Sequence, residues 1–352
     1  MKKRLLAILM AATMSLSLLA GCGSTASDES TEDSSSTVGT GTEQEEDTTS
    51  DSLRTEYPLT VDSYNAEGEV VSVTFESAPE RIVSTQLSIT ELLLELGLKD
   101  KIVGIMDNDN TVDAELQAEL DDLTSLGYKS TISKEAILAV DPDIVMGKAT
   151  LMFTDKTIGT VEDYLDLGIN VYTQLASVDV IDQSLENILE DIRTIGKIFD
   201  VQEAANAYAD SLKEKLNETL ETVSSQTEGQ EEMSVILMSG FQDGTFMAFS
   251  SAMHSVMLEA VNAVNVLETG GTGMTLENLI SLNPDAIIYI TADRFAETDT
   301  DAVERLLSEA AIQDVPAIAN EKILEIGYDD IMDYGARTIS TVEVLADFLY
   351  GE

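Results

Sequence analysis

The segments SKEAILAVDPDIV (residues 133–145) and TLENLISLNPDAI (residues 275–287) decide the fold, because they align without a gap at an offset of 142 residues. Glu135 in the first copy matches Glu277 in the second, and each copy contains a Pro-Asp pair. Each copy predicts a capped helix start, an apolar helix stopped by proline, and a buried strand. Duplication of an ancestral lobe explains the repeat, and convergence on a common helix–turn–strand unit is the alternative. Two copies at matching places predict two paired lobes.

Around the repeat, short apolar segments alternate with helical patterns. We expect strands at 81–84, 102–105, 144–146, 171–173, 235–239, 246–248, 286–290 and 323–326. We expect helices at 88–96, near 251–263, and at 276–282, 301–309 and 335–350. Ser88 and Glu91 form a capping-box pattern at the first of these helices. Apolar strands between helices are typical of mostly parallel sheets covered on both faces, so the fold class is α/β with doubly wound lobes.

Two helices are predicted between the two halves. Residues 182–224 lack proline and carry apolar side chains at helical spacing, with a break near Asp200. The second helix, about 201–224, would be roughly 36 Å long at 1.5 Å per residue, which makes it a stiff strut between lobes. A hairpin over 59–62 and 70–75 opens the folded part. The expected architecture is two α/β lobes joined by a long backbone helix, with a ligand cleft between them.

The N-terminus reads as a processing signal. A basic start precedes an apolar run of about 16 residues, which is shorter than the ~20 of a spanning helix. The run ends in Leu19-Ala20-Gly21-Cys22. It resembles a bacterial lipoprotein signal with its lipobox, so we expect Cys22 to carry the lipid; a plain secretory signal near a free cysteine is the alternative. The predicted regions are a signal peptide (1–22), a disordered acidic Ser/Thr-rich tether (23–56), an N-terminal lobe (57–180), a helical connection (181–228) and a C-terminal lobe (229–352).

Composition excludes several classes of function. The chain has 66 acidic and 19 basic side chains and a formal net charge of −47, which opposes nucleic acid and anionic membrane surfaces. One cysteine and one histidine exclude a disulfide framework and Cys/His zinc sites. The sequence shows no nucleophile elbow, phosphate loop or assembled nucleophile–base pair. We therefore expect no enzyme activity, no catalytic residue, no resident metal and no cofactor.

Further motifs are APERIVSTQLSITELLLELGLKDKIVGI (78–105), SLENILEDIRTIGKIF (184–199) and DYGARTISTVEVLADFLY (333–350). With the two repeat segments, they make residues 57–352 resemble ABC-transporter substrate-binding lipoproteins of the siderophore, haem and cobalamin class. The resemblance implies a lipid-anchored monomer on the extracytoplasmic face of the cell membrane, serving a permease dimer and its ATPase. It implies a metal-chelate ligand, with a ferric siderophore ranked before cobalamin or haem. It also implies that Glu135 and Glu277 dock on permease arginines. A surface adhesin is the third alternative, although an adhesin needs no paired lobes.

Candidate ligand residues follow the strands, because ligands of open α/β sheets bind beyond the carboxyl ends of strands. The candidates are Gln86, Asn108, Lys148, Phe153, Gln242, Arg294, Tyr328 and Tyr334. The loops contain few basic residues, which favours a near-neutral chelate such as a hydroxamate complex over a highly anionic catecholate complex. We expect His254 to be a half-exposed helix residue, and the oxygen-rich segment 328–334 to be a solvated loop rather than a metal site. We expect the glycine-rich segment 270–273 to be a flexible lead-in to the next helix.

Overall fold

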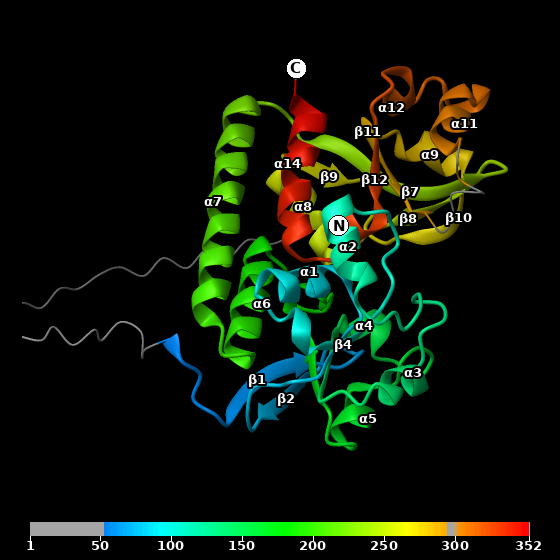
Figure 1. Ribbon diagram of the computed structural model, residues 1–352. Coiled ribbons are helices and arrows are strands. Elements are labelled where there is room, and N and C mark those ends of the chain that lie inside the picture. Colours follow the sequence, from blue (N-terminus) through cyan, green and yellow to red (C-terminus); the bar gives the residue numbers. More distant parts are fainter. Residues whose placement is uncertain (1–52, 294–298, 300, 352) are drawn as a thin grey trace, which may run out of the picture. The chain divides into compact units, whose positions relative to one another are not determined.

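Figure 1 shows the computed structural model of the protein. The strands of the N-terminal lobe form a parallel sheet in the order β4-β3-β5-β6. The structure describes residues 53–293, 299 and 301–351, so Cys22, the signal peptide and most of the tether lie outside it. The strands are β3 (Ile82–Ser84), β4 (Ile102–Ile105), β5 (Ile144–Gly147) and β6 (Asn170–Thr173). The helices of this lobe are α1 (Leu87–Glu95), α2 (Ala114–Asp121), α3 (Lys134–Ala139), α4 (Ala149–Met152) and α5 (Val161–Leu165). The predicted hairpin is confirmed as β1 (Leu59–Tyr64) and β2 (Val70–Phe75), paired antiparallel.

The sheet of the C-terminal lobe is mixed: among the described strands, three pairings are parallel and two, those of β8 with β7 and β10, are antiparallel. Its order is β10-β8-β7-β11-β12, with β9 beside β7. The strands are β7 (Met233–Gln242), β8 (Thr245–Phe249), β9 (Ala263–Asn265), β10 (Gly271–Thr275), β11 (Ala286–Thr291) and β12 (Ile323–Gly327). The helices are α8 (Ala252–Ala260), α9 (Leu276–Leu282), α11 (Ala302–Ser308), α12 (Pro316–Ala319), α13 (Tyr328–Met332) and α14 (Ala336–Tyr350). Short 3-10 helices lie at Lys99–Lys101, Leu175–Ser177 and Ala310–Ile312.

A tight turn turns β8 back along β7. Asp243 and Gly244 both have positive φ, and the flanking Gln242 and Thr245 are paired across the hairpin. Two central residues with positive φ match the twist of antiparallel strands, and Asp-Gly is a preferred pair for such turns. The glycine-rich segment then continues the sheet as β10, antiparallel to β8. The expectation of a flexible lead-in there was wrong.

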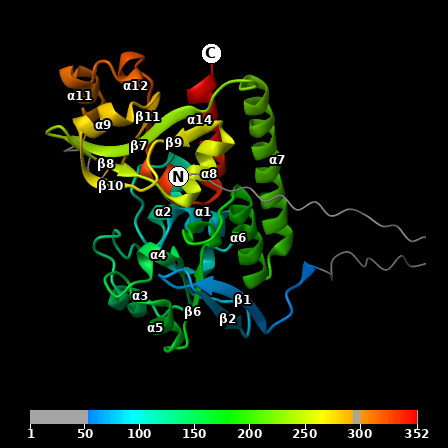
Figure 2. The same cartoon turned by 180° about the vertical axis from the view of Figure 1, so that it is seen from behind.

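The predicted strut is α7 (Gln202–Gln226), preceded by α6 (Leu185–Ile198). Asp200 adopts a positive φ of 56° between the two helices, which explains the break. The 25 residues of α7 span roughly 37 Å at 1.5 Å per residue. Figures 1 and 2 show α7 alongside both lobes. One hydrophobic cluster includes buried residues from both sheets and from α6, α7, α8 and α14. Because the lobes share this core, it opposes large hinge motion between them.

The repeat is confirmed in three dimensions. Asp141 and Asn283, which are equivalent at the 142-residue offset, both adopt left-handed backbone, with φ of 50° and 48°. The equivalent Asp143 and Asp285 each accept backbone N–H groups from the neighbouring strand region: Asp143 from Arg81 at 2.9 Å and Asp285 from Ser234 at 3.0 Å. The two copies therefore build the same helix–turn–strand unit in each lobe.

Two local expectations need correction. The helix α1 begins one residue before Ser88, with Gln86 as its N-cap residue, so Ser88 and Glu91 form no capping box there. Residues 53–56, which we assigned to the tether, contact the α6–α7 junction: the Thr55 backbone N–H donates to Asp200 at 2.7 Å, and Arg54 pairs with Asp200 at 3.2 Å. Within the described part of the chain, no helix combines the length and apolarity needed to cross a membrane.

Candidate ligand cleft

Loops at the carboxyl ends of strands from both lobes meet in a buried polar seam. Lys148 follows β5, and its ammonium contacts the Met332 carbonyl. It lies 3.8 Å from the Asp333 carboxylate and 4.5 Å from the centre of the Tyr334 ring. The side chains of Lys148 and Asp333 are each 5% exposed. This cation is therefore enclosed by groups of its own chain rather than presented to solvent.

Backbone and amide groups complete the seam. The Ser88 N–H donates to the Asp333 carboxylate at 3.3 Å, and the Ser88 hydroxyl donates to the Asp333 carbonyl at 3.0 Å. The Gln174 amide donates to the Tyr334 carbonyl at 3.4 Å. A Cβ on Gly335 would lie 2.4 Å from the Ser88 Cβ. Glycine at position 335 is thus what allows the N-terminus of α14 to approach α1 this closely.

Burial shifts the ionisable groups of the seam toward their neutral forms. It lowers the pKa of Lys148 to about 8, although the Asp333 carboxylate opposes the shift. Burial raises the pKa of Asp333, and Lys148 opposes that shift in turn. Burial, with the negative charge of Asp333, raises the pKa of Asp329 to about 7. At each of these positions, the effect of desolvation on the pKa exceeds the opposing effect of a neighbouring charge or of hydrogen bonds.

His254 belongs to the edge of this seam. It is 2% exposed and packs edge-to-face on Tyr334, with ring centres 5.8 Å apart. Burial, followed by the charge of Lys148, lowers its pKa to about 4, so the imidazole is neutral at pH 7. The expectation of a half-exposed helix residue was therefore wrong. Its position in the first turn of a helix is confirmed, since α8 starts at Ala252.

A hollow of about 400 Å³ opens beside the seam, at the carboxyl ends of β7, β11 and β12. Its lining is mostly apolar and includes a few polar groups. The lining residues are Ser239, Gly240, Gln242, Met247, Phe249, Ile290, Thr291, Ala292, Asp299 and Tyr328. Apolar hollows of this size with few polar groups are typical of small-molecule sites, and their place beyond strand ends agrees with α/β ligand sites in general.

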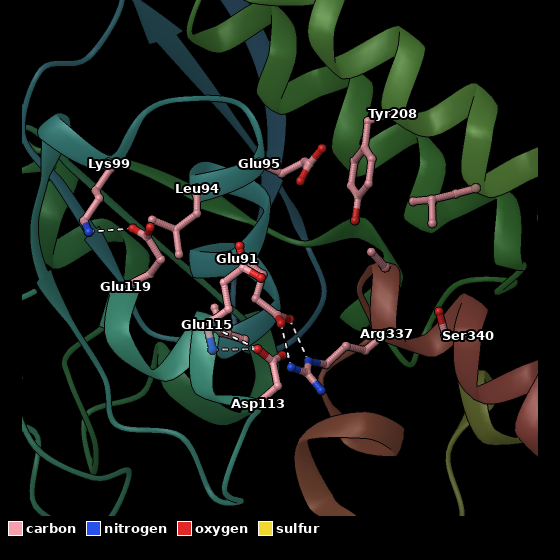
Figure 3. Close-up of a pocket in the computed structure, with 13 residues that line it drawn as sticks. Glu91, Leu94, Glu95, Lys99, Asp113, Glu115, Glu119, Tyr208, Arg337 and Ser340 are labelled. Atoms are coloured by element: carbon pink, nitrogen blue, oxygen red, sulfur yellow. Dashed lines mark hydrogen bonds and ion pairs between the residues drawn. The ribbon is translucent and has the colours of Figure 1, made fainter. Parts of the chain in front are cut away.

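A second cavity, of about 510 Å³, lies between α1, α2, α7 and α14 (Figure 3). Carboxylates dominate it, and its two basic side chains are already paired. Arg337 donates to both oxygens of Glu91, at 2.6 and 2.7 Å, and to Asp330 at 2.8 Å. Lys99 pairs with Asp122 at 3.0 Å. Arg337, like Lys148, therefore offers no free positive charge to a ligand.

Comparison with known proteins identifies the fold family. The family model described as "Periplasmic binding protein" matches residues 82–329, which is most of the chain. The chain belongs to this family.

This periplasmic binding protein is similar to three proteins with informative descriptions. It is 25% identical to an uncharacterised ABC transporter substrate-binding lipoprotein, YvrC, of Bacillus subtilis strain 168, over 99% of this chain and 98% of the relative. It is 22% identical to a cobalamin-binding protein of Halobacterium salinarum, over 78% of this chain and 71% of the relative. A solved structure described as an ABC-type Fe³⁺-hydroxamate transport system of Saccharomonospora viridis superposes with a TM-score of 0.68 at 25% identity, over 84% of this chain and 99% of the other. The family match confirms the family that the sequence motifs indicated, and the structural similarity confirms the two-lobed architecture.

The predicted ligand residues of this periplasmic binding protein fall in several places. Gln86, Lys148 and Tyr334 belong to the seam, because Gln86 and Lys148 both contact Asp333 and Lys148 lies over the Tyr334 ring. Gln242 and Tyr328 line the hollow. Asn108 lies in the loop after β4, where its amide donates to the Asn110 carbonyl. Phe153 is fully buried against Tyr164 in the core of the N-terminal lobe, so it faces neither the seam nor the hollow. Arg294 lies outside the described residues.

Sequence reasoning missed several seam residues. Gln174 directly follows β6, so the rule that nominated the other loops would have found it. Asp329 and Asp333 were expected in a solvated loop, but they are 4% and 3% exposed and α13 forms there instead. Among the described side chains, no group of three or more His, Cys, Asp or Glu residues is arranged to hold a metal ion.

The predicted docking residues of this periplasmic binding protein are both exposed in the first turns of their helices. Glu135 lies in α3, whose N-cap residue Ser133 accepts the Ala136 N–H at 3.2 Å. Glu277 lies in α9, and a hydrogen bond from Thr275 lowers its pKa. Figures 1 and 2 show α3 and α9 on the side of the lobes away from α7.

Proposed function

We propose that this periplasmic binding protein is the substrate-binding lipoprotein of an ABC importer. Lipid on Cys22 would hold it at the extracytoplasmic face of the cell membrane, where it would pass a metal chelate to a permease dimer driven by an ATPase. The observation that carries the proposal is the family match, which spans both lobes. The apolar hollow at the strand ends supports it. The Bacillus relative, aligned over nearly its whole length, is itself named as such a lipoprotein. The proposal includes no catalytic step.

The cargo we propose is a near-neutral ferric siderophore of the hydroxamate type. The net charge of −47 repels highly anionic complexes. Lys148 is buried beside Asp333, and Arg337 is paired with Glu91 and Asp330, so neither is available to neutralise a catecholate complex. The similarity to a structure described as an Fe³⁺-hydroxamate transport system supports this choice. Cobalamin, a large chelate without high negative charge, is the second candidate, supported by the Halobacterium relative.

Thermal unfolding with a panel of chelates tests the proposal. The panel contains a neutral ferric trihydroxamate, a ferric tricatecholate, cobalamin and haem. A ligand present at 100 times its Kd stabilises the native protein by about 2.7 kcal/mol. We expect the trihydroxamate to raise the unfolding temperature and the tricatecholate to leave it unchanged. A shift with the tricatecholate alone would contradict the charge argument, and no shift with any of the four chelates would contradict the proposed cargo class.

Docking on the permease completes the proposal. A binding protein with two equivalent lobes presents the same group twice to the two copies of a permease. Glu135 and Glu277 satisfy this condition, because the repeat places them at equivalent positions on exposed first turns. Arg–carboxylate pairs are charge-assisted and geometrically specific, which suits selective and reversible docking. A purely local role, in which each acid favours the dipole of its own helix, is the alternative that the docking experiment below addresses.

A further inference from the structure

One acidic side chain, that of Asp299, lines the hollow of about 400 Å³. Among the described lining residues there is no other acid and no lysine, arginine or histidine. The Asp299 side chain is 13% exposed, so most of its surface is removed from water. The protein therefore places a single carboxylate in the wall of a mostly apolar hollow.

Buried groups hold this carboxylate in place. Tyr289 of β11 is fully buried, and its hydroxyl donates to Asp299 Oδ1 at 2.6 Å. The same hydroxyl accepts the Phe241 N–H at 2.9 Å. Burial, followed by the hydrogen bond to Asp299, raises the pKa of Tyr289, which keeps the hydroxyl a donor. Oδ1 of Asp299 is thus fixed by a buried strand residue, which is the support that a precise binding site needs.

The other oxygen of Asp299, Oδ2, remains available to a ligand. Arg305 lies close by, but its Nη2 is 4.0 Å from Oδ1, beyond hydrogen-bond distance. The same Nη2 donates to the Phe241 carbonyl at 2.7 Å instead. Within the part of the chain that the structure describes, no residue donates a hydrogen bond to Oδ2. Because a carboxylate can accept about four hydrogen bonds, Asp299 keeps acceptor capacity for a bound molecule.

A cation on an apolar stem is the group that fits these surroundings. A carboxylate with little water around it gains more from a charged donor than from a neutral one. Met247, Phe249 and Ile290 line the same hollow and offer apolar surface to the stem. The net charge of −47 raises the local concentration of cations and lowers that of anions. An alkylammonium group therefore satisfies the carboxylate, the apolar wall and the field of the whole protein.

We propose that Asp299 is an ammonium-binding subsite of the hollow and that the cargo is a chelate with a terminal ammonium on an apolar arm. The inference rests on the proposed function for the chelate, whose neutral hydroxamate core is unchanged, but the subsite itself is a property of this chain. The alternative is that Asp299 only holds its own chain segment to β11 through Tyr289. The two roles differ in one respect, because only the subsite distinguishes a cation from a neutral group of the same size.

The subsite can be tested without a chelate. The probes are hexylamine, which is charged at pH 7, and hexanol, which has the same length and no charge. The NMR methyl resonance of Met247, a lining residue, reports occupancy of the hollow. The subsite variant is Asp299→Asn, which removes the charge and keeps an oxygen for the Tyr289 hydroxyl. The matched control is Asp243→Asn, which removes the same charge from an exposed turn beside the lining residue Gln242, at a positive φ that asparagine also tolerates.

Loss of a hydrogen bond between charged groups corresponds to roughly 10- to 100-fold in affinity. We expect the wild-type protein and Asp243→Asn to bind hexylamine more tightly than hexanol by about that factor, and Asp299→Asn to bind the two probes alike. Equal affinities of the wild-type protein for the two probes, or no binding of hexylamine, would overturn the subsite. A preference for the amine that survives Asp299→Asn would overturn the role of Asp299.

Two ferric trihydroxamates that differ only at one end, a free ammonium or its acetylated form, extend the test to the cargo. We expect the ammonium form to bind the wild-type protein roughly 10- to 100-fold more tightly than the acetylated form, and Asp299→Asn to bind both equally. Equal binding of the two forms to the wild-type protein would overturn the ammonium arm and leave the proposed cargo class intact. If hexylamine binds as expected while neither chelate binds, the subsite stands and the proposed cargo class fails.

Discussion

Replacing Lys148 by methionine is expected to make the protein more stable at pH 7. Burial lowers the pKa of this ammonium from 10.5 to about 8, even with Asp333 beside it. The unfolded chain therefore binds the proton more tightly than the native protein does. At about 1.4 kcal/mol per pKa unit, the charged form costs the native state roughly 3 kcal/mol at any pH below 8.

Methionine removes this cost and some favourable contacts with it. The ammonium lies 4.5 Å from the centre of the Tyr334 ring and contacts the Met332 carbonyl. Loss of such a cation–π contact costs about 0.5–2 kcal/mol, and loss of one hydrogen bond about 1 kcal/mol. The unbranched methionine side chain replaces most of the lysine stem. The attraction of Asp333, which lies 3.8 Å from the ammonium, is already contained in the lowered pKa of Lys148. The net expectation is therefore a gain of about 1 kcal/mol in the free energy of unfolding at pH 7.

The pH dependence distinguishes this cause from better packing. As pH rises from 8 to 10.5, the native wild-type protein loses the Lys148 proton and its penalty disappears. The advantage of Lys148→Met should therefore shrink to zero or reverse by pH 10. Urea unfolding at pH 7 and pH 10 measures this, with the exposed Lys156→Met as matched control. A loss of more than 1 kcal/mol at pH 7, or a gain that persists at pH 10, would refute the reasoning.

Three other predictions concern the anchor, the docking face and a buried acid. Cys22→Ser should move the protein from the membrane fraction to the soluble fraction, because stable anchoring needs lipid; retention of the variant in carbonate and high salt would contradict lipidation at Cys22. Glu135→Ala with Glu277→Ala should leave chelate affinity unchanged and abolish ligand-stimulated ATPase of the reconstituted transporter, with each single variant intermediate; normal stimulation by the double variant would limit both residues to a role in their own helices. Asp191, 4% exposed, accepts from the Tyr172 hydroxyl at 2.6 Å and from the Leu175 and Ala176 N–H groups at 2.7 and 3.0 Å. Asp191→Ala leaves these buried donors unpaired and should lower the free energy of unfolding by about 2–4 kcal/mol, whereas a loss below 0.5 kcal/mol would show that the donors find other partners.

The elements that sequence predicts well are those specified by local patterns. Continuous apolar runs marked β5 and β11, because strands buried on both faces need apolar side chains at every position. The break between α6 and α7 was visible at Asp200, a residue type that tolerates left-handed backbone. The edge strand β10 was missed because Gly271–Thr275 has neither an apolar run nor alternation, and its pairing with β8 alone defines it. The Asp243-Gly244 turn was a local signal that we did not use.

The candidate site was predictable only in part, because its contacts join residues far apart in the sequence. The strand-end rule nominated Gln86 and Lys148, but their contacts with Asp333 depend on how the two lobes pack. The same cause explains why the burial of His254 was not predicted, because Tyr334, which packs against it, lies in a distant part of the sequence. Phe153 shows the opposite error: it stands after a strand, yet α4 turns it into the core. Position after a strand indicates a site, while tertiary packing decides which side chains reach it.

Isothermal titration of a neutral ferric trihydroxamate against two matched variants tests the central claim most directly. Met247, 40% exposed, lines the hollow, while Val344, 45% exposed, lies on α14 outside it. The account predicts 1:1 binding to the wild-type protein, at least about 10-fold weaker binding to Met247→Asp because a charge in the apolar hollow must be desolvated, and unchanged binding to Val344→Asp. Equal affinities of the wild-type protein and Met247→Asp would place the ligand elsewhere. Absence of any binding would contradict the proposed cargo.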